Sequence, residues 1–288
     1  MKKMIFLLMT ALLPIASPGL SRAGEDKGNE MRSLVEHSSL PREQKESLLR
    51  QAHSALQSGI PSDDITVIVK RGLARGWQGS ALEESLATAE KAKRQGLPYR
   101  PVLDRIQQGL SKGVPADRVS RATTLLTEKL SKADGIVTGL IKSGMKTGAP
   151  PERTDAVQNI ARALEREIPG ETLVKMGITR AKSDPSLSRF SNGVSTMTSL
   201  IEMGMPVDHA AKLIGKAMER GYSDKDMIML EKDMSFALRE GWKMEEAVGM
   251  MDSSMERGHS GNLHKGMDPG QVHGSGSGVH GTGHHGHK

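Results

Sequence analysis

Histidine is concentrated at the C-terminal end of the chain. Seven of the ten histidines follow Gly258, and ten glycines accompany them from Gly258 on. Neutral imidazole is a common ligand of borderline metals, and the segment HHGHK brings three rings within four residues. The tail is therefore a candidate transition-metal site (Ni, Zn or Cu), with His280, His284, His285 and His287 as the expected ligands. The alternative is a soluble, pH-sensitive tail, and on both readings the chain requires no cofactor.

Methionine is concentrated in the last third of the chain. Twelve of the 15 methionines after residue 23 lie between Met197 and Met267. Thioethers bind Cu(I), so a copper site has to be considered. Core filling is the preferred interpretation, because several of them fall on the apolar faces of expected helices: Met197, Met218, Met227, Met234, Met250, Met251 and Met255. Met229, Met244 and Met267 carry the remaining copper hypothesis.

No catalytic pattern is found among the polar residues. His37, His53 and His209 stand apart from any serine or carboxylate pattern, and there is no metalloprotease helix, phosphate-binding loop or nucleophile elbow. Paired acids such as Asp63-Asp64 belong to the first turns of expected helices, where they complement the helix dipole. The chain has no cysteine, which excludes disulfides and thiol catalysis. We expect a protein that is not an enzyme.

The first 23 residues have the layout of a secretory signal peptide. Lys2 and Lys3 precede an apolar run of about a dozen residues, and small residues precede a cleavage site after Ala23. An uncleaved membrane anchor is the alternative. Cleavage would leave 37 basic against 34 acidic residues, so the net charge of +6 falls to +3. We expect a periplasmic or extracellular protein with no stable membrane anchor and no nucleic-acid partner.

A repeat with a period of about 36 residues runs through the middle of the chain. The stretch GIPSDDITVIVKRGLARGW (59–77) has the same layout as GMPVDHAAKLIGKAMERGY (204–222). Related copies predict six starts, at residues 59, 96, 131, 167, 204 and 241. Between them lie further helical patterns over about 42–58, 78–95, 116–130, 151–166, 186–203 and 223–240.

Glycines mark the expected helix ends. A glycine can adopt the left-handed conformation that ends a helix, and the hydrophobic residue after it folds back on the last turn. We assign this structural role to Gly59, Gly76, Gly96, Gly113, Gly148, Gly204, Gly221 and Gly241. Trp77, Tyr222 and Trp242 fill the hydrophobic slot, so we read them as structural rather than as binding residues.

A second class of small residue recurs inside the repeat, thirteen residues after each start. Five of its six members are small: Gly72, Gly109, Gly144, Ala217 and Ser254. A glycine inside a helix costs about 0.5–1 kcal/mol relative to alanine, so its recurrence indicates a close helix contact. The sixth member is Arg180, and the segment 177–193 around it departs from the repeat. Either this segment is an irregular joint between two halves or it is a kink that contacts a ligand.

These patterns predict an all-α fold: a right-handed-type, α-solenoid-like array of about six helical hairpins. Residues 24–40 precede it as a partly disordered segment, the repeat domain spans 41–258, and a disordered tail spans 259–288. The array resembles the helical-hairpin solenoids, which include tetratricopeptide-like repeats, in period and layout, although the aromatic and proline positions of the latter are not matched. This resemblance implies that an unidentified protein or peptide binds on a concave face. The alternative function is metal binding through the histidine-rich tail.

Overall fold

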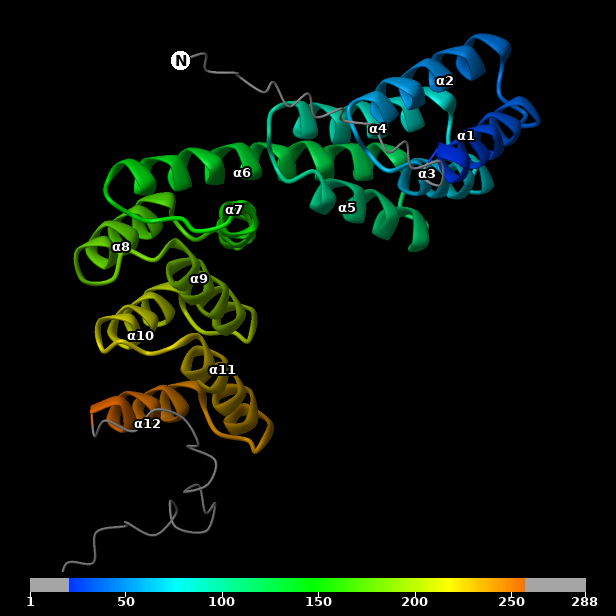
Figure 1. Cartoon of the computed structure of the whole chain (residues 1–288). Helices are drawn as coiled ribbons and strands as arrows, with labels where there is room; N and C mark the ends of the chain where they lie inside the picture. Colours follow the sequence, from blue (N-terminus) through cyan, green and yellow to red (C-terminus); the bar gives the residue numbers. More distant parts are fainter. Residues whose placement is uncertain (1–20, 257–288) are drawn as a thin grey trace, which may run out of the picture. The chain divides into compact units, whose positions relative to one another are not determined.

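The computed structural model describes residues 21–256, with side chains from residue 29 onward, and this part of the chain is helical (Figure 1). No strand is found in it, and the only β-type pairing among these residues is an isolated bridge between Lys146 and Ser186. The helices are α1 (Ser21–Glu36), α2 (Arg42–Gln57), α3 (Ser62–Ala74), α4 (Gly79–Arg94), α5 (Arg100–Ser111), α6 (Ala116–Lys142), α7 (Pro150–Glu165), α8 (Gly170–Ser183), α9 (Leu187–Glu202), α10 (Val207–Glu219), α11 (Asp224–Arg239) and α12 (Met244–Glu256). The all-α prediction is confirmed for these residues. The expected tail and most of the expected signal peptide lie outside them.

One backbone motif ends nine of these helices. The amide of the hydrophobic residue after the turn donates to the carbonyl five residues earlier, at 2.9–3.1 Å. The donors are Ile60, Trp77, Leu97, Val114, Met145, Ile168, Met205, Tyr222 and Trp242. This bond satisfies a carbonyl that the helix leaves without a partner, and it brings the hydrophobic side chain back onto the last turn. The motif thus reverses the chain and contributes to the core at the same time.

The residue before each donor has a positive φ, and two positions differ from the sequence analysis. Gly144 (φ 104°) ends α6, whereas Gly148 does not adopt a positive φ and donates its amide to Glu152 Oε2 instead. Seven of the eight glycines assigned to helix ends therefore have a positive φ. After α7 the position is occupied by Glu167 (φ 61°), the one non-glycine residue with positive φ in the described part of the chain.

The third expected hairpin is replaced by one uninterrupted helix, α6, which has 27 residues. The predicted start at Ser131 is wrong, because no proline or turn glycine occurs there to end the hydrogen-bond ladder. An apolar stripe at helical spacing also continues through this point: Leu126, Leu130, Ala133, Val137 and Leu140, each at most 4% exposed. Without a proline or turn glycine to end it, the helix continues through Ser131.

The segment expected to be partly disordered contains α1. Met31 and Val35 of this helix are buried, and α1 packs against α2 and α3. Burial of these two side chains offsets part of the entropy lost on ordering the segment. The predicted cleavage point after Ala23 falls within the first turn of α1.

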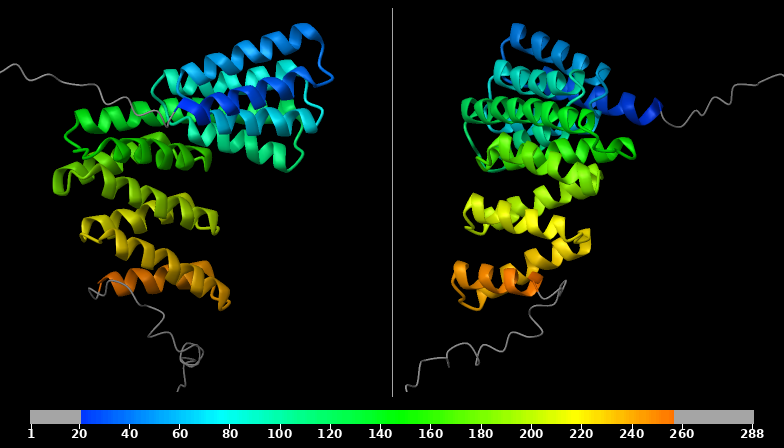
Figure 2. Two further views of the ribbon diagram at one scale, coloured as in Figure 1. Left: turned by 45° about the vertical axis from the view of Figure 1, so that its right-hand side comes forward. Right: turned by 90° about the vertical axis from the view of Figure 1, so that its left-hand side faces the viewer.

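The chain divides into two compact units, and the boundary between Glu128 and Lys129 falls within α6 rather than in the segment 177–193. In the first unit, α1, α3 and α5 pack in sequence, and α2 packs on α4. In the second unit, α7, α9 and α11 form one layer, while α8, α10 and α12 form the other (Figures 1 and 2). Each unit buries its apolar side chains between these alternating helices.

Close helix contacts occur at two of the three glycines for which they were expected. A Cβ on Gly72 would lie 2.3 Å from Leu82 Cδ2, and one on Gly109 would lie 2.4 Å from Val119 Cγ2. The prediction is wrong for Gly144, where a Cβ would have no neighbour within 4 Å in the described structure. Gly144 is needed for its turn conformation and not for packing.

Candidate functional site

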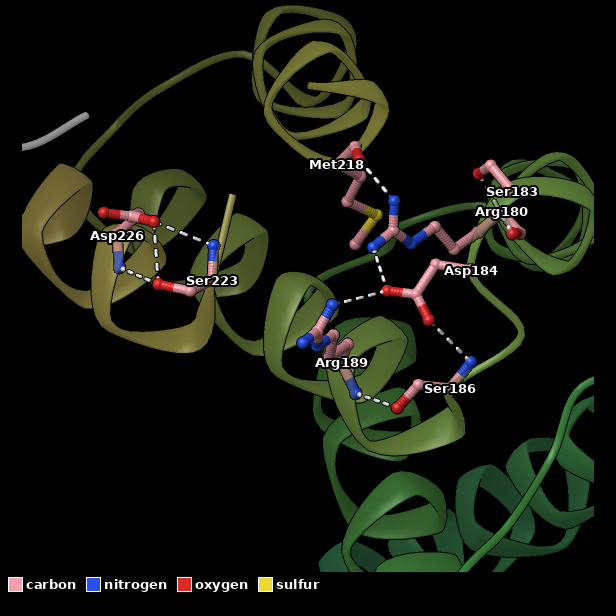
Figure 3. Close-up of polar contacts among 8 residues, drawn as sticks. All are labelled: Arg180, Ser183, Asp184, Ser186, Arg189, Met218, Ser223 and Asp226. Carbon is pink, nitrogen blue, oxygen red and sulfur yellow. Dashed lines mark hydrogen bonds and ion pairs between the residues drawn. The ribbon is translucent and has the colours of Figure 1, made fainter. Parts of the chain in front are cut away.

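The junction between α8 and α9 is built around Arg180 (Figure 3). Arg180 occupies a position where the other copies have small residues, and it is only 6% exposed. One terminal nitrogen of its guanidinium donates to the Met218 carbonyl in the last turn of α10, and the other donates to Asp184 Oδ2. Arg180 therefore ties the end of α8 to the end of α10.

Asp184 ends α8 in an extended conformation and accepts several hydrogen bonds. Its Oδ2 also accepts from Arg189 at 2.9 Å, and its Oδ1 accepts from the Ser186 amide at 3.2 Å. Partial burial alone would raise the pKa of this carboxyl. The hydrogen bonds from Arg189 and Ser186, with the charges of both arginines, outweigh burial and lower the pKa. Asp184 is therefore a carboxylate at neutral pH and is shared by two guanidinium groups.

A cavity of about 310 Å³ opens between α8 and α10 beside this cluster. Its lining combines the apolar residues Met176, Ala211, Gly215 and Met218 with polar residues that include Lys175, Thr179, Arg180, Ser183 and Glu219. The cavity depends on the small residues of α10. A Cβ on Gly215 would meet no described atom within 4 Å, so this glycine faces open space.

A second hollow, a groove of about 810 Å³, runs along the other side of α8 toward the C-terminal part of α6. Ile136, Val174 and Ile178 form its apolar surface, and Lys132, Lys175 and Glu171 border it. The side chain of Ile178 is 41% exposed. The groove and the cavity share Lys175 and Thr179, so the solvent-facing side of α8 is hollowed on both flanks.

A third, polar hollow lies between α2 and α4 in the first unit, where Glu90 is buried. Its carboxylate accepts from Gln51 and Ser54 at 2.7 and 2.8 Å and pairs with Arg94 at 2.5 Å. Buried charges of this kind are tolerated when they are paired and hydrogen-bonded. This cluster fixes α2 against α4, and we assign it a structural role.

The other residues singled out from the sequence differ in burial, and some lie outside the described part of the chain. The tail histidines His280, His284, His285 and His287 lie outside the described residues, as does Met267. Of the methionines assigned to the core, Met250 is half-buried, and Met197, Met218, Met227, Met234, Met251 and Met255 are buried. Met229 and Met244 are half-buried. Trp77 is buried, while Tyr222 and Trp242 are half-buried at the ends of their helices.

The three histidines of the helical part are exposed. His37 Nδ1 lies 2.8 Å from the Ser33 carbonyl and 3.4 Å from Ser33 Oγ, and His53 lies 3.0 Å from Gln57. These are local contacts along a helix. In the described part of the chain no group of three or more histidine or acidic side chains is placed to hold a metal ion.

Sequence analysis singled out the segment 177–193 but did not identify the cavity beside it. The available signal was Arg180 itself, a large charged residue at a position otherwise filled by small ones. Gly215 gave no usable signal, because a glycine facing open space cannot be distinguished in sequence from one at a close contact.

Comparisons of the chain with protein-family models, with curated proteins and with solved structures give no match. Among residues 21–256, no helix combines the length and the apolar character needed to cross a membrane.

Proposed function

We propose that this chain is an exported, non-enzymatic helical-repeat protein that binds a protein or peptide partner. The observation that carries the proposal is the apolar groove between α6 and α8, whose lining includes the exposed side chain of Ile178 and two lysines. A hydrophobic surface with a polar rim is the usual composition of a peptide-binding site. The partner we infer is a peptide segment with an aliphatic anchor residue.

The repeat interpretation has independent support from contacts one period apart. Side chains of one hairpin reach residues 36 positions further along the chain: Ser47 with Glu83, Ser54 with Glu90, Asp64 with Arg100, Arg75 with the Ser111 carbonyl, Glu84 with Ser120, Arg166 with Glu202, and Lys216 with Asp252. Such nearest-neighbour contacts are expected of stacked hairpins. We propose two short solenoid-like arrays, one in each unit, in place of one array of six hairpins.

Export is proposed from the signal-peptide layout of residues 1–23, and the non-enzymatic character from the lack of a recognisable catalytic pattern in the sequence. Export is tested separately from binding. Export predicts that a tagged full-length chain expressed in a Gram-negative host is recovered in the periplasm or the medium, with the mature N-terminus at Gly24. Recovery only of the uncleaved chain would overturn it.

Peptide binding is tested with displayed random peptides selected on the full chain. Selected peptides should contain an aliphatic anchor and should bind Ile178→Asp about tenfold more weakly or worse, because the substitution places a charge in the apolar groove. Ile228→Asp is the matched control, since Ile228 is 53% exposed on α11 and does not line the groove. This variant should bind like the wild type.

Equal loss of binding in both isoleucine variants, or undiminished binding in Ile178→Asp, would show that the groove is not the binding surface. Selection that yields no binder would contradict the peptide function itself.

A further inference from the structure

We infer that the cavity beside Arg180 is a binding site for a small monocarboxylate with a short apolar group. This goes beyond the proposed peptide function and does not depend on it, because the cavity lies on the α10 side of α8 and the groove lies on the α6 side. Free organic acids and the C-terminal residue of a peptide share this chemistry.

The first observation is a hydrogen-bond donor without an acceptor. Arg180 is more than nine-tenths buried, its two terminal nitrogens are engaged, and its Nε has no acceptor among the described residues. A buried N–H that is left unpaired is costly, and a charged one more so. Tethering of α8 to α10 uses one N–H of each terminal nitrogen, and each of these nitrogens carries a second N–H. Nε itself is closed to solvent, so the donors that a ligand in the cavity can use are the remaining terminal N–H groups of Arg180.

The second observation is the local balance of charge. Arg180 and Arg189 share the single carboxylate of Asp184. The other two charged residues that line the cavity, Lys175 and Glu219, have opposite signs. One positive charge is therefore left over at the site, and it is complementary to a ligand with one negative charge. A carboxylate also presents acceptor oxygens in the geometry that a guanidinium recognises.

The third observation is the size and lining of the cavity. Its volume of about 310 Å³ is at the lower end of the usual range for ligand sites, about 300–1,000 Å³. Met176, Ala211 and Met218 contribute apolar surface to the same lining as the polar residues. A carboxylate at the polar residues would thus leave its apolar group against the methionines, whose flexible thioether side chains adapt to different shapes.

The fourth observation is that the repeat does not require an arginine at this position. The equivalent residues Gly72, Gly109, Ala217 and Ser254 are small and buried. A small residue here is compatible with the fold, so Arg180→Ala should fold. Burying an arginine at this position, by contrast, costs free energy because its charge leaves water. Binding of an anionic ligand gives a physical reason for the presence of the arginine.

The test is a calorimetric titration of the full chain with three carboxylates: isovalerate, N-acetyl-L-leucine and a pentapeptide ending in leucine. The control for each is its amide. We expect at least one acid to bind, and its amide to bind about tenfold more weakly or worse, because the amide lacks the charge. Binding of isovalerate points to free acids, and binding of the pentapeptide alone points to a peptide C-terminus.

Two variants locate the site. Arg180→Ala should reduce acid binding about tenfold or more, whereas Arg166→Ala should not, although Arg166 also shares a carboxylate with a second arginine. Gly215→Leu should also abolish binding, because its side chain fills the cavity without altering Arg180. Gly249→Leu is its control, at another helical glycine whose Cβ would meet no described atom within 4 Å.

The inference is overturned if no acid binds at millimolar concentration, if acids and amides bind alike, or if Gly215→Leu binds like the wild type. Should Arg180→Ala fail to fold, the Gly215→Leu and Gly249→Leu pair decides the question alone. If a variant loses acid binding but still binds the peptides selected for the groove, the carboxylate site is distinct from the proposed peptide surface.

Discussion

Gly109 of α5 lies so close to Val119 of α6 that a Cβ on the glycine would come within 2.4 Å of Val119 Cγ2. Gly72 of α3 has the same relationship to Leu82 of α4, one period earlier. In both pairs the neighbour is ten residues further along the chain. The glycine lets α3 pack closely on α4, and α5 on α6, which explains its place inside a helix despite its low helix propensity.

We therefore predict that Gly109→Leu lowers the free energy of unfolding by about 1–3 kcal/mol through overpacking, although leucine is the better helix former. The measurement is urea unfolding followed by circular dichroism. Gly135→Ala is the control, because a Cβ there would meet no described atom within 4 Å. It should gain about 0.5–1 kcal/mol. A stabilised Gly109→Leu variant would mean that α5 and α6 do not pack in this way.

Glu167 adopts a conformation that glycine adopts at the other eight helix ends of this type. A left-handed conformation costs a residue with a Cβ about 1–2 kcal/mol, and the exposed side chain of Glu167 has little packing to lose. Glu167→Gly should therefore raise the free energy of unfolding by about 1 kcal/mol. The reverse change, Gly221→Ala at φ 75°, should lower it by a similar amount. If Glu167→Gly is destabilising, the turn after α7 has a different conformation.

Glu202 of α9 accepts hydrogen bonds from Arg162 of α7 and from Arg166, the residue that follows α7. Burial alone would raise the pKa of Glu202, but these hydrogen bonds and the charges of both arginines outweigh it and lower the pKa below its ordinary 4.5. The unfolded chain thus takes up this proton at a higher pH than the folded chain does. The stabilisation is complete above about pH 4.5 and is lost as the pH falls through the lower folded-state pKa.

Glu202→Gln should accordingly flatten the decline of melting temperature between about pH 5.5 and pH 3, as measured by calorimetry. Part of the decline should remain, because the pKa of Asp184 is lowered by the same kind of interaction. Equal helix content of both proteins at neutral pH, checked by circular dichroism, is the control. An identical pH dependence in the variant would show that the two ion pairs of Glu202 do not stabilise the fold.

The histidine-rich tail leads to a prediction from sequence alone. Imidazole binds metals only when it is deprotonated, so Ni or Zn binding at about pH 7.5 should weaken at about pH 5.5 and disappear on truncation after Gly258. The melting temperature should stay nearly the same, because the helical core holds itself together by apolar burial. Tight Cu(I) binding by the truncated chain would instead place a site at the methionines of the helical part.

The helix ends could be predicted because their physics is local. A glycine followed by a hydrophobic residue is a local signal that ends a helix, and in four cases a proline follows as well. This signal locates seven helix ends correctly, at glycines such as Gly59 and Gly204. The same reasoning failed at Ser131, where the hydrogen-bond ladder continues because nothing interrupts it. It also failed at Gly148, because the turn was taken four residues earlier at Gly144.

Only the tertiary structure determines which atoms the buried side chains contact. The sequence shows that Arg180 breaks a pattern of small residues, but its contact with the Met218 carbonyl joins residues 38 positions apart. The sequence also contains Gly177, Gly193 and Gly215, and gives no indication of which of them faces an empty space. Gly177 and Gly193 lie against Leu140 and Met218, whereas Gly215 opens the cavity. Packing between helices depends on how closely segments far apart in the sequence approach one another, and no single stretch of the sequence determines that distance.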